Sequence, residues 1–289
     1  MDIKFYKKKI YELAMIEPIK GSKMTDCKWN VTKIKNPFIN TKWFADPFIL
    51  DYDDKSIILL VEEMDFKINR GRIAKLIIDR DKNEITDIKV LLDLDTHLSF
   101  PAIERIGEDI YVYPENSASG QLNIYKYNKE TESLDSRKIL ISEPLTDSIL
   151  RNYNNEQYIF STKQPNPNGN ILKIYKKTGG RFEEFQEVIF SDNSARGAGN
   201  WFYVKDKLIR PAQDCNGYYG IGLIFQEVGF SNNRFEFNEI SRVKHPSGYD
   251  GMHTFNEYKE LCIIDYRRPV YPFIYYPLAK ISKFLRKFL

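Results

Sequence analysis

The sequence predicts an all-β fold, a five-bladed β-propeller, from a repeated segment and from a high content of aromatic residues. The fullest copies of the repeat are WFADPFIL, which begins at Trp43, and HLSFPAIERIGEDIYVYPENS, which begins at His97. Weaker copies begin at Leu145, Ser194 and Tyr249. A repeat of about 40–50 residues with several short strands is typical of propeller blades. The 19 Tyr and 19 Phe residues also favour strands over helices.

Each copy of the repeat contains the parts of a blade in the same order. A polar opening precedes a short apolar strand, a polar turn such as the one at Asp53, and a second apolar strand. Alternating third strands follow, for example over residues 71–79. The segment KWNVTKI, residues 28–34, belongs to a lead-in over residues 1–40, and we expect it to complete the last blade and close the ring. We assign residues 1–268 to a single propeller.

Charge and cysteine content argue against several classes of function. The 43 basic and 40 acidic side chains give a net charge of +3, so no nucleic-acid partner is expected. Cys27, Cys215 and Cys262 are widely spaced, which argues against a disulfide framework or a zinc site. The sequence shows no signal-peptide pattern and no apolar run of about 18 residues, so we expect a cytoplasmic protein.

The segment over residues 269–289 differs from the repeats because it contains no acidic residue. After Pro277, apolar residues follow helical spacing at Leu278, Ile281, Phe284, Leu285 and Phe288. Much of the other face carries the cations Lys280, Lys283, Arg286 and Lys287. This pattern predicts a short basic amphipathic helix that binds an anionic membrane surface, at the inner face of the plasma membrane. The alternative is a terminal helix packed on the propeller.

Polar residues at the start of the first strand and at the end of the second strand of each copy are expected to meet at the hub of the ring. The candidate catalytic residues are Asp46, Glu115, Asp147 and His253. The candidate substrate-binding residues are Glu63, His97, Arg196, Arg210, Gln213, Asp214, Tyr219, Asp250 and Arg267. Such groups are costly to bury unless they pair or bind a ligand. For any one of them, an ion pair between blades or a turn cap is the alternative role.

The residue types indicate a role for several of these groups. Asp46 is the candidate general base, because a carboxylate can take a proton from a sugar hydroxyl. Arg196, Arg210 and Arg267 would form a clamp for phosphate or carboxylate. His253 would serve as an acid or as a phosphate contact, and a hydrogen-bonded structural histidine is the alternative.

Cofactor motifs are not found in the sequence. There is no phosphate-binding glycine loop, no GxSxG and no HExxH, so no cofactor is predicted. DxD tripeptides occur at residues 51–53 and 93–95, and the first has the composition of a turn. No metal-ligand set is assigned, and a divalent metal ion stays an open alternative.

The motifs WFADPFI, HLSFP, YPENSA, SARGAG, RPAQDC and DGMHTF resemble the N-terminal domain of glucosamine inositolphosphorylceramide transferase-like proteins. The resemblance runs from about Trp29 to Arg268. More distantly, the layout is similar to five-bladed propeller glycosidases, which implies that Asp46 and Asp147 match two of their three acids. Where the resemblance implies the third acid, near the start of the fourth blade, this chain has Arg196. Ordinary hydrolysis needs two carboxyl groups across the scissile bond, so this difference argues against it.

Together, the residues and the resemblance predict a carbohydrate-active enzyme. The favoured hypothesis is a glycosyltransferase of bacterial cell-surface polysaccharide assembly, with a nucleotide-sugar donor and a lipid-linked or glycan acceptor. One alternative is a glycoside hydrolase that uses Asp46 with Glu115 or Glu63. A second alternative is a non-catalytic glycan-binding module that presents a substrate to a partner enzyme.

Overall fold

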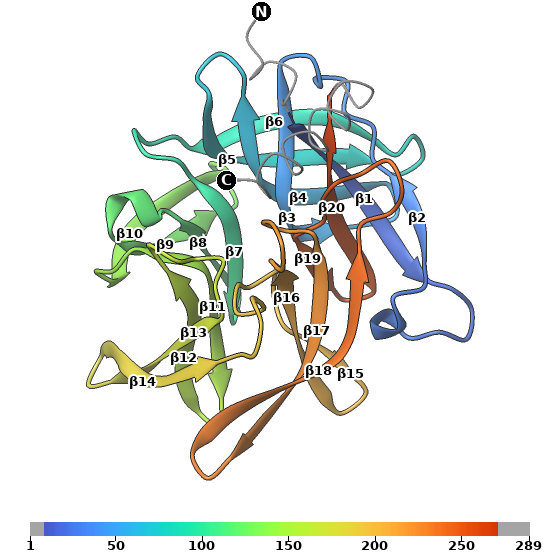
Figure 1. Cartoon of the computed structure of the whole chain (residues 1–289). Coiled ribbons are helices and arrows are strands. Elements are labelled where there is room, and N and C mark those ends of the chain that lie inside the picture. The colour runs from blue at the N-terminus through green and yellow to red at the C-terminus, as the bar shows by residue number, and fades with distance from the viewer. Residues whose placement is uncertain (1–8, 271–289) are drawn as a thin grey trace, which may run out of the picture.

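The computed structural model describes residues 9–270, which form five antiparallel sheets of four strands around a common centre (Figure 1). The predicted all-β five-bladed propeller is therefore confirmed. Within this range the only helical elements are two 3-10 turns, Met24–Asp26 and Ser117–Ser119. No helix of the described range is long and apolar enough to cross a membrane. The amphipathic helix predicted after Pro277 lies outside the described residues.

The first four blades are continuous stretches of chain whose strands pair in sequence order. Blade one contains β3 (Lys42–Tyr52), β4 (Ser56–Asp65), β5 (Arg70–Asp79) and β6 (Glu84–Leu92). Blade two contains β7 (Ser99–Ile106), β8 (Asp109–Glu115), β9 (Leu122–Asn128) and β10 (Ser133–Ile141). Blade three contains β11 (Leu145–Tyr153), β12 (Glu156–Lys163), β13 (Ile171–Thr178) and β14 (Arg181–Ile189). Blade four contains β15 (Phe202–Val204), β16 (Lys207–Asp214), β17 (Gly222–Ser231) and β18 (Arg234–Lys244).

Blade five joins the two ends of the described chain. It contains, in spatial order, β19 (Phe255–Tyr258), β20 (Leu261–Pro269), β1 (Lys9–Pro18) and β2 (Trp29–Lys33). β1 pairs with β20 from Lys9 opposite Pro269 to Ile16 opposite Cys262. The segment expected to close the ring, residues 28–34, contains β2, which lies in blade five but pairs with β1. The strand that pairs with β20 is β1, which the sequence did not predict. Much of β1 is buried on both faces, so its sequence lacks the alternation of a half-buried strand.

Aromatic side chains pack neighbouring blades against one another. Phe235 of β18 meets Tyr158 and Phe160 of β12 edge to face, with ring centroids 4.9 Å apart in both pairs. The ring of Trp201 lies 4.4 Å from that of Phe160. Pairs of this kind contribute about 0.5–1.5 kcal/mol beyond the burial of their area. This packing joins blade three to blade four.

A bulge interrupts the inner strand of blades one, two and three at the same place in the repeat. Asp46, Phe100 and Asp147 have φ angles of 50°, 44° and 46°, in the left-handed region that residues other than glycine rarely adopt. The strand pairing changes register around each of them. In blade four the equivalent residue is Gly199, where an added Cβ would collide with the carbonyl oxygen of Phe255. Bulges re-aim side chains, and here they direct three inner strands towards the hub.

Candidate functional site at the hub

The bulges connect successive blades through buried carboxylates. The backbone N–H of Asp46 donates to Asp265 Oδ2 at 3.1 Å, and that of Phe100 donates to Asp46 Oδ2 at 3.0 Å. The N–H of Asp147 donates to Glu115 Oε2 at 3.2 Å. Each acceptor comes from the preceding blade. Asp46 and Glu115, two of the predicted site carboxylates, therefore also link neighbouring blades.

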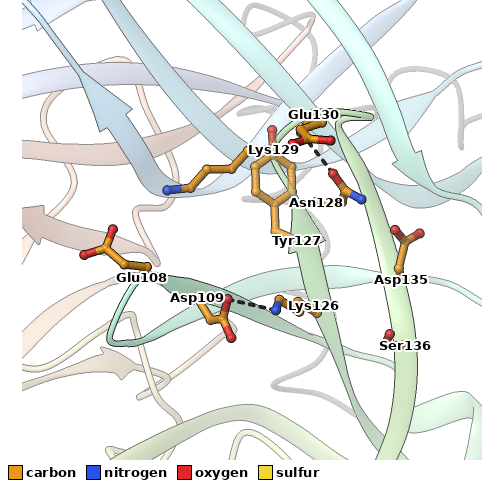
Figure 2. Close-up of a pocket in the computed structure, with 9 residues that line it drawn as sticks. All are labelled: Glu108, Asp109, Lys126, Tyr127, Asn128, Lys129, Glu130, Asp135 and Ser136. Atoms are coloured by element: carbon orange, nitrogen blue, oxygen red, sulfur yellow. Dashed lines mark hydrogen bonds and ion pairs between the residues drawn. The ribbon is translucent and has the colours of Figure 1, made fainter.

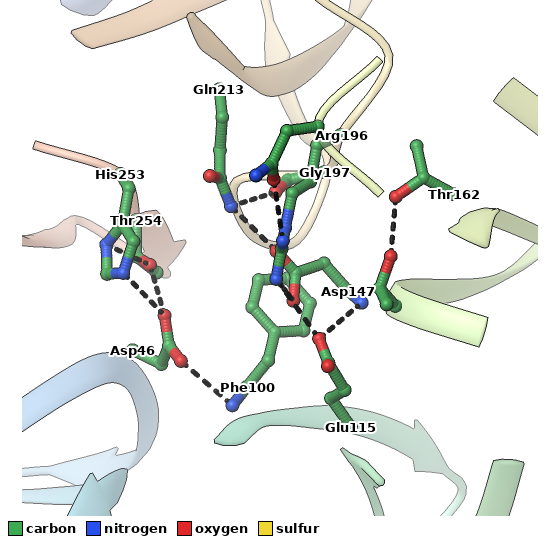
Figure 3. Close-up of polar contacts among 12 residues, drawn as sticks. Asp46, Phe100, Glu115, Asp147, Thr162, Arg196, Gly197, Gln213, His253 and Thr254 are labelled. Atoms are coloured by element: carbon green, nitrogen blue, oxygen red, sulfur yellow. Dashed lines mark hydrogen bonds and ion pairs between the residues drawn. The ribbon is translucent and has the colours of Figure 1, made fainter. Parts of the chain in front are cut away.

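The first polar cluster lies between blades five and one, where Asp46 faces His253 and Thr254 (Figure 3). His253 Nδ1 donates to Asp265 at 2.8 Å, and the backbone N–H groups of His253 and Thr254 donate to the same carboxylate at 3.1 and 3.0 Å. Thr254 Oγ1 donates to Asp46 Oδ1 at 2.7 Å, and His253 Nε2 lies 3.7 Å from that oxygen. All four residues are buried.

Burial and neighbouring charges control ionisation in this cluster. Burial raises the pKa of Asp46 to about 7, although the His253 charge acts in the opposite direction. Burial alone would lower the pKa of His253, but the Asp265 and Asp46 carboxylates raise it above its ordinary value. Burial also opposes the charge of Asp265, yet His253 and the backbone donors hold the pKa of Asp265 below normal. Asp265 is therefore ionised at neutral pH, whereas Asp46 is close to its titration midpoint.

The second polar cluster brings Glu115, Asp147, Arg196 and Gln213 together from blades two, three and four (Figure 3). Arg196 grips Asp147 with two donors, Nε to Oδ2 at 2.6 Å and Nη2 to Oδ1 at 3.2 Å. Its Nη2 also lies 3.2 Å from Glu115 Oε2, and its Nη1 donates to Asn168 Oδ1 at 2.8 Å. The structure therefore confirms that these distant residues meet, with Arg196 at their centre.

The two carboxyl groups of this cluster ionise differently. Burial, followed by the neighbouring Asp147 charge, raises the pKa of Glu115 well above its ordinary range. Burial also opposes the charge of Asp147, but the Arg196 guanidinium outweighs it and holds the pKa of Asp147 below normal. The two pKa values are therefore shifted in opposite directions, and Asp147 is the carboxylate that Arg196 keeps ionised at neutral pH.

Gln213 leaves one buried acceptor without a partner. Its Nε2 donates to Asp147 Oδ2 at 2.7 Å and to the carbonyl oxygen of Gly197 at 2.9 Å. Both neighbours are acceptors, so the amide cannot be turned around without losing both bonds. Gln213 Oε1 is then left buried with no donor among the described residues. A ligand hydroxyl or a bound water at this point of the hub would satisfy it.

Two tyrosines pack against His253, and one of them, Tyr219, also reaches the second cluster. The Tyr219 ring lies 5.0 Å from the Arg196 guanidinium and meets the His253 ring edge to face, with centroids 5.3 Å apart. Tyr11 of β1 stacks on the other side of His253, at 4.7 Å and an interplanar angle of 19°. Tyr219 is partly exposed, so it offers an aromatic surface beside both clusters. Such a surface suits the apolar face of a sugar ring.

Three other predicted residues form ion pairs beside the clusters. His97 Nε2 lies 3.2 Å from Glu62 Oε1, and 46% of the His97 side chain is exposed. Arg267 Nε donates to Asp250 Oδ1 at 3.1 Å, and the Arg267 guanidinium lies 5.8 Å from the Tyr219 ring. Asp250 and Arg267 are thus near the hub but already paired with each other.

Arg210 does not reach the hub, contrary to its predicted role in an anion clamp. Its guanidinium is fully buried and donates to the carbonyl oxygens of Ser194 and Ala195 and to Gln226. The ring of Phe237 lies 5.5 Å from it. Burial lowers the pKa of Arg210 to about 9.

Asp214 and Glu63 likewise point away from the clusters. Asp214 accepts from Arg242 at 3.2 Å and from the Asn216 backbone at 3.0 Å, and Glu63 lies between Lys42 and Arg72. The reason is the same for all three misplaced residues: successive side chains of a strand face opposite sides, and Gln213 and Glu62 already take the hub side.

Comparison with known proteins agrees with the resemblance seen in the sequence. The model of the family "Glucosamine inositolphosphorylceramide transferase 1, N-terminal" matches residues 5–259. The chain belongs to this family. Glucosamine inositolphosphorylceramide transferase 1 from Oryza sativa subsp. indica is 28% identical over 236 residues, and the Arabidopsis thaliana protein is 26% identical over 235 residues. These matches cover 75% of this chain but only 31% and 30% of the relatives, so the chain spans about a third of their length.

Solved structures of other proteins share the propeller fold of this chain. A GH43 β-xylosidase/α-arabinofuranosidase from a compost microbial metagenome aligns with a TM-score of 0.53 and 10% identity, over 78% of this chain and 90% of that one. A GH43_1 enzyme from Xanthomonas citri aligns with a TM-score of 0.52 and 9% identity, over 79% and 87%. The similarity to five-bladed propeller glycosidases is confirmed for the fold, which is all that such low identity shows.

Three residues of the hub were not predicted from the sequence: Asp265, Thr254 and Tyr11. A signal for Asp265 exists, because it lies on the second strand of its blade, as Glu115 does. Both carboxylates accept the backbone N–H of a bulge residue in the next blade. The prediction instead chose Arg267, two residues later on the same strand. Tyr11 had no signal, because it lies on the strand that was not predicted.

Asp46, His253 and Asp265 form the only group of His, Cys, Asp or Glu between residues 9 and 270 whose ligand atoms gather closely, within 4.8 Å. Their hydrogen bonds argue against a metal site. Both Asp265 oxygens accept backbone N–H groups, and Asp265 also accepts the His253 ring proton. A cation would have to displace these donors, so we assign no metal ion to the group.

A surface pocket of about 560 Å³ lies on blade two (Figure 2). The turn after β7, the strand β9 and the start of β10 line it, including Glu108, Tyr127 and Ser136. Lys126 and Asp109 form an ion pair of 2.8 Å there and are both 45% exposed. None of the predicted site residues lines this pocket, and its charges are solvated, so it is not a candidate for the chemistry of the hub.

Proposed function

We propose that this propeller is a glycosyltransferase domain that binds a sugar at its hub and deprotonates an acceptor hydroxyl with Asp46. The observation that carries the proposal is the placement of Asp46 at the hub, where its Oδ1 accepts from Thr254 at 2.7 Å and lies 3.7 Å from His253 Nε2. Burial there raises the pKa of Asp46 to about 7. A general base works best when its pKa lies near the working pH. The unpartnered Gln213 Oε1 and the partly exposed Tyr219 supply a hydroxyl acceptor and an aromatic surface beside it.

Transfer is favoured over hydrolysis by the arginine of blade four. Hydrolysis of a glycoside uses two carboxyl groups on opposite sides of the scissile bond. Here Arg196 binds Asp147 with two donors and also contacts Glu115. A guanidinium at this place suits the departure of an anionic leaving group better than the protonation of a sugar oxygen. The names of the curated relatives, which are transferases, agree with this choice.

For the donor we propose a nucleotide sugar, as used in bacterial surface-polysaccharide assembly, with its diphosphate near Arg196 and Arg267. Both guanidinium groups are paired with carboxylates in this structure, at 12% and 8% side-chain exposure. To bind, a diphosphate would have to replace one of the present partners of these guanidinium groups. Arg196 has an uncharged partner, Asn168, that a diphosphate could replace. Arg210 takes no part, because its donors are occupied inside blade four.

Saturation-transfer NMR with a panel of nucleotide sugars and free oligosaccharides tests this proposal. We expect at least one nucleotide sugar to bind, and we expect Arg196→Ala to weaken it about tenfold or more, as loss of charged contacts does. Arg234→Ala, on the exposed start of β18, is the matched control. Binding of oligosaccharides without any nucleotide sugar would count against transfer.

A non-catalytic glycan-binding module is the second candidate. It is favoured by the length of the match, since the chain corresponds to only 31% of its rice relative. In that case glycans bind at the hub, Asp46→Asn leaves affinity within about twofold, and no donor is consumed in any turnover assay.

We propose further that residues 269–289 hold the domain at an anionic membrane surface inside the cell. The support is the sequence alone, which has cations and no acid in this segment. Co-sedimentation with vesicles containing about 30% phosphatidylserine should fall sharply when Lys280, Lys283, Arg286 and Lys287 are changed to Gln. Equal sedimentation of both proteins would refute this part.

A further inference from the structure

His253 is enclosed by titratable groups on every side. Asp265 of β20 is hydrogen-bonded to Nδ1, and Asp46, in the bulge of β3, lies 3.7 Å from Nε2. Tyr11 of β1 covers one face of the ring, and the edge contact with Tyr219 closes another side. The positive charge of Arg267 opposes protonation of His253. Two carboxylates therefore set the state of one imidazole.

The hydrogen bonds fix which ring nitrogen carries the proton when His253 is neutral. Asp265 Oδ1 accepts the backbone N–H groups of His253 and Thr254 at 3.1 and 3.0 Å, and Oδ2 accepts the N–H of Asp46 at 3.1 Å. An ionised carboxylate can only accept, so the ring nitrogen 2.8 Å away must donate. Nδ1 therefore keeps its proton, and Nε2 is the nitrogen that gains or loses one.

His253 Nε2 and Asp46 Oδ1 are too close for both to be unprotonated at low cost. They lie 3.7 Å apart in a buried site, where a lone pair facing a carboxylate oxygen is repelled. We propose that His253 and Asp46 act together as one base that holds a single proton between them, with Asp265 as the positioning residue that fixes the tautomer. This inference rests on the proposed function, because it identifies the proton acceptor of that reaction.

The proton step then has a defined balance. An acceptor hydroxyl at the pair loses its proton to whichever of Nε2 or Oδ1 is free. The O–H bond breaks, a bond from hydrogen to nitrogen or oxygen forms, and the electron pair stays on the acceptor oxygen. That oxygen bonds to the anomeric carbon of the donor while the leaving group departs with the electron pair of the broken bond.

Nitrogen NMR of the histidine side chains tests this arrangement without any substrate. The full chain has three histidines, so His97→Gln, His245→Gln and His253→Gln assign every imidazole signal in ¹⁵N-labelled protein. We expect neutral His253 to carry its proton on Nδ1. We expect Asp46→Asn to lower the His253 pKa by about one unit or more, as the loss of a close carboxylate does. Asp51→Asn, at an exposed carboxylate near the end of β3, should leave the titration unchanged.

Asp265→Asn tests the positioning role, because the amide replaces an acceptor by a group that can also donate. We expect the neutral tautomer to change and the His253 pKa to fall by about 1–3 units. A neutral wild-type ring with its proton on Nε2 would overturn the inference, as would a His253 pKa that ignores Asp46→Asn. The wild-type tautomer and the effect of Asp46→Asn are measured without the Asp265→Asn variant, so they still decide the question if that variant does not fold. Failure of all sugars to bind would instead remove the proposed function and leave this pair intact.

Discussion

Asp46 and Asp147 occupy the same place in their blades, with φ angles of 50° and 46°, but their carboxyl groups behave in opposite ways. Burial opposes the charge of both. Asp147 keeps a low pKa because Arg196 grips it with two donors, whereas Asp46 faces an imidazole and other acids and has a pKa of about 7. The partner, and not the backbone, therefore decides which aspartate is available as a base.

Asp46→Asn should stabilise the protein at high pH. The raised pKa means that Asp46 favours folding fully below its unfolded value near 3.8, and that this contribution is lost as the pH rises through about 7. The amide mimics the protonated form, and the Thr254 hydroxyl can turn to match it. We expect a higher Tm than wild type at pH 8, with each kcal/mol worth about 2–4 °C, and little difference at pH 4. Circular dichroism melts at both values check this, with Asp51→Asn as the control.

Asp147→Asn should have the opposite effect. The lowered pKa of Asp147 contributes stability above the unfolded value near 3.8, and this contribution is lost as the pH falls through the folded value. The variant also removes the Asp147 charge that raises the pKa of Glu115, so Glu115 can pair with Arg196 more readily. We therefore expect a loss limited to about 1–3 kcal/mol at pH 8. Urea unfolding at pH 8 and pH 3 measures the difference. An equal loss at both values would contradict the assignment.

At this scale the sequence predicts the types of hub residue better than their orientation. Asp46, Glu115, Asp147, Arg196, Gln213 and His253 were found because polar groups recur at one place in the repeat. Arg210, Asp214 and Glu63 lie an odd number of strand positions from the hub-facing Gln213 or Glu62, so their side chains are on the opposite face of the strand. Near the ends of strands, bulges shift the alternation, and no residue pattern marks the bulge at Phe100.

The strand β16 shows how one element serves both structure and site. Its Arg210 binds the carbonyl oxygens of Ser194 and Ala195, the two residues just before Arg196. Three positions along, on the other face, Gln213 binds Asp147. On one face of the strand, Arg210 therefore holds the loop that carries Arg196. On the other face, Gln213 holds Asp147, which is the partner of Arg196.

Arg210→Lys should destabilise blade four although it keeps the charge. An ammonium group cannot reach two carbonyl oxygens and Gln226 with the flat fork of a guanidinium, so buried acceptors lose their donors. We expect a loss of about 1–3 kcal/mol in the free energy of unfolding, measured with urea. Arg234→Lys, on the exposed start of β18, should change it by less than about 0.5 kcal/mol. A similar effect from both substitutions would disprove this role for Arg210.

The ring as a whole is closed by backbone pairing of β1 with β20. The repeat and its aromatic content were sufficient to predict five blades, because both recur along the chain. The way the ring closes was only half predicted. β1 belongs to no repeat copy and is buried on both faces, so neither periodicity nor alternation reveals it.

Removal of residues 1–33 should open the ring and leave blade five with two strands. Two isolated strands are marginal in water, so we expect loss of the cooperative unfolding transition. A synthetic peptide of residues 9–33, added in excess, should restore the transition by supplying β1 and β2 again. Removal of residues 1–8 alone is the control and should leave the melt close to that of the full chain. A cooperative melt of the shorter protein without peptide would show that closure is not needed.

The pairing of β1 with β20 also sets the order of events during translation. The nascent chain makes β1 first, but its partner exists only after residue 269 has been added, on the order of ten seconds or more later. For that interval β1 exposes an unpaired edge that invites aggregation, and Asp46 has neither His253 nor Asp265 beside it. A prematurely terminated product would therefore carry most of the blades but not the cluster of Asp46, His253 and Asp265.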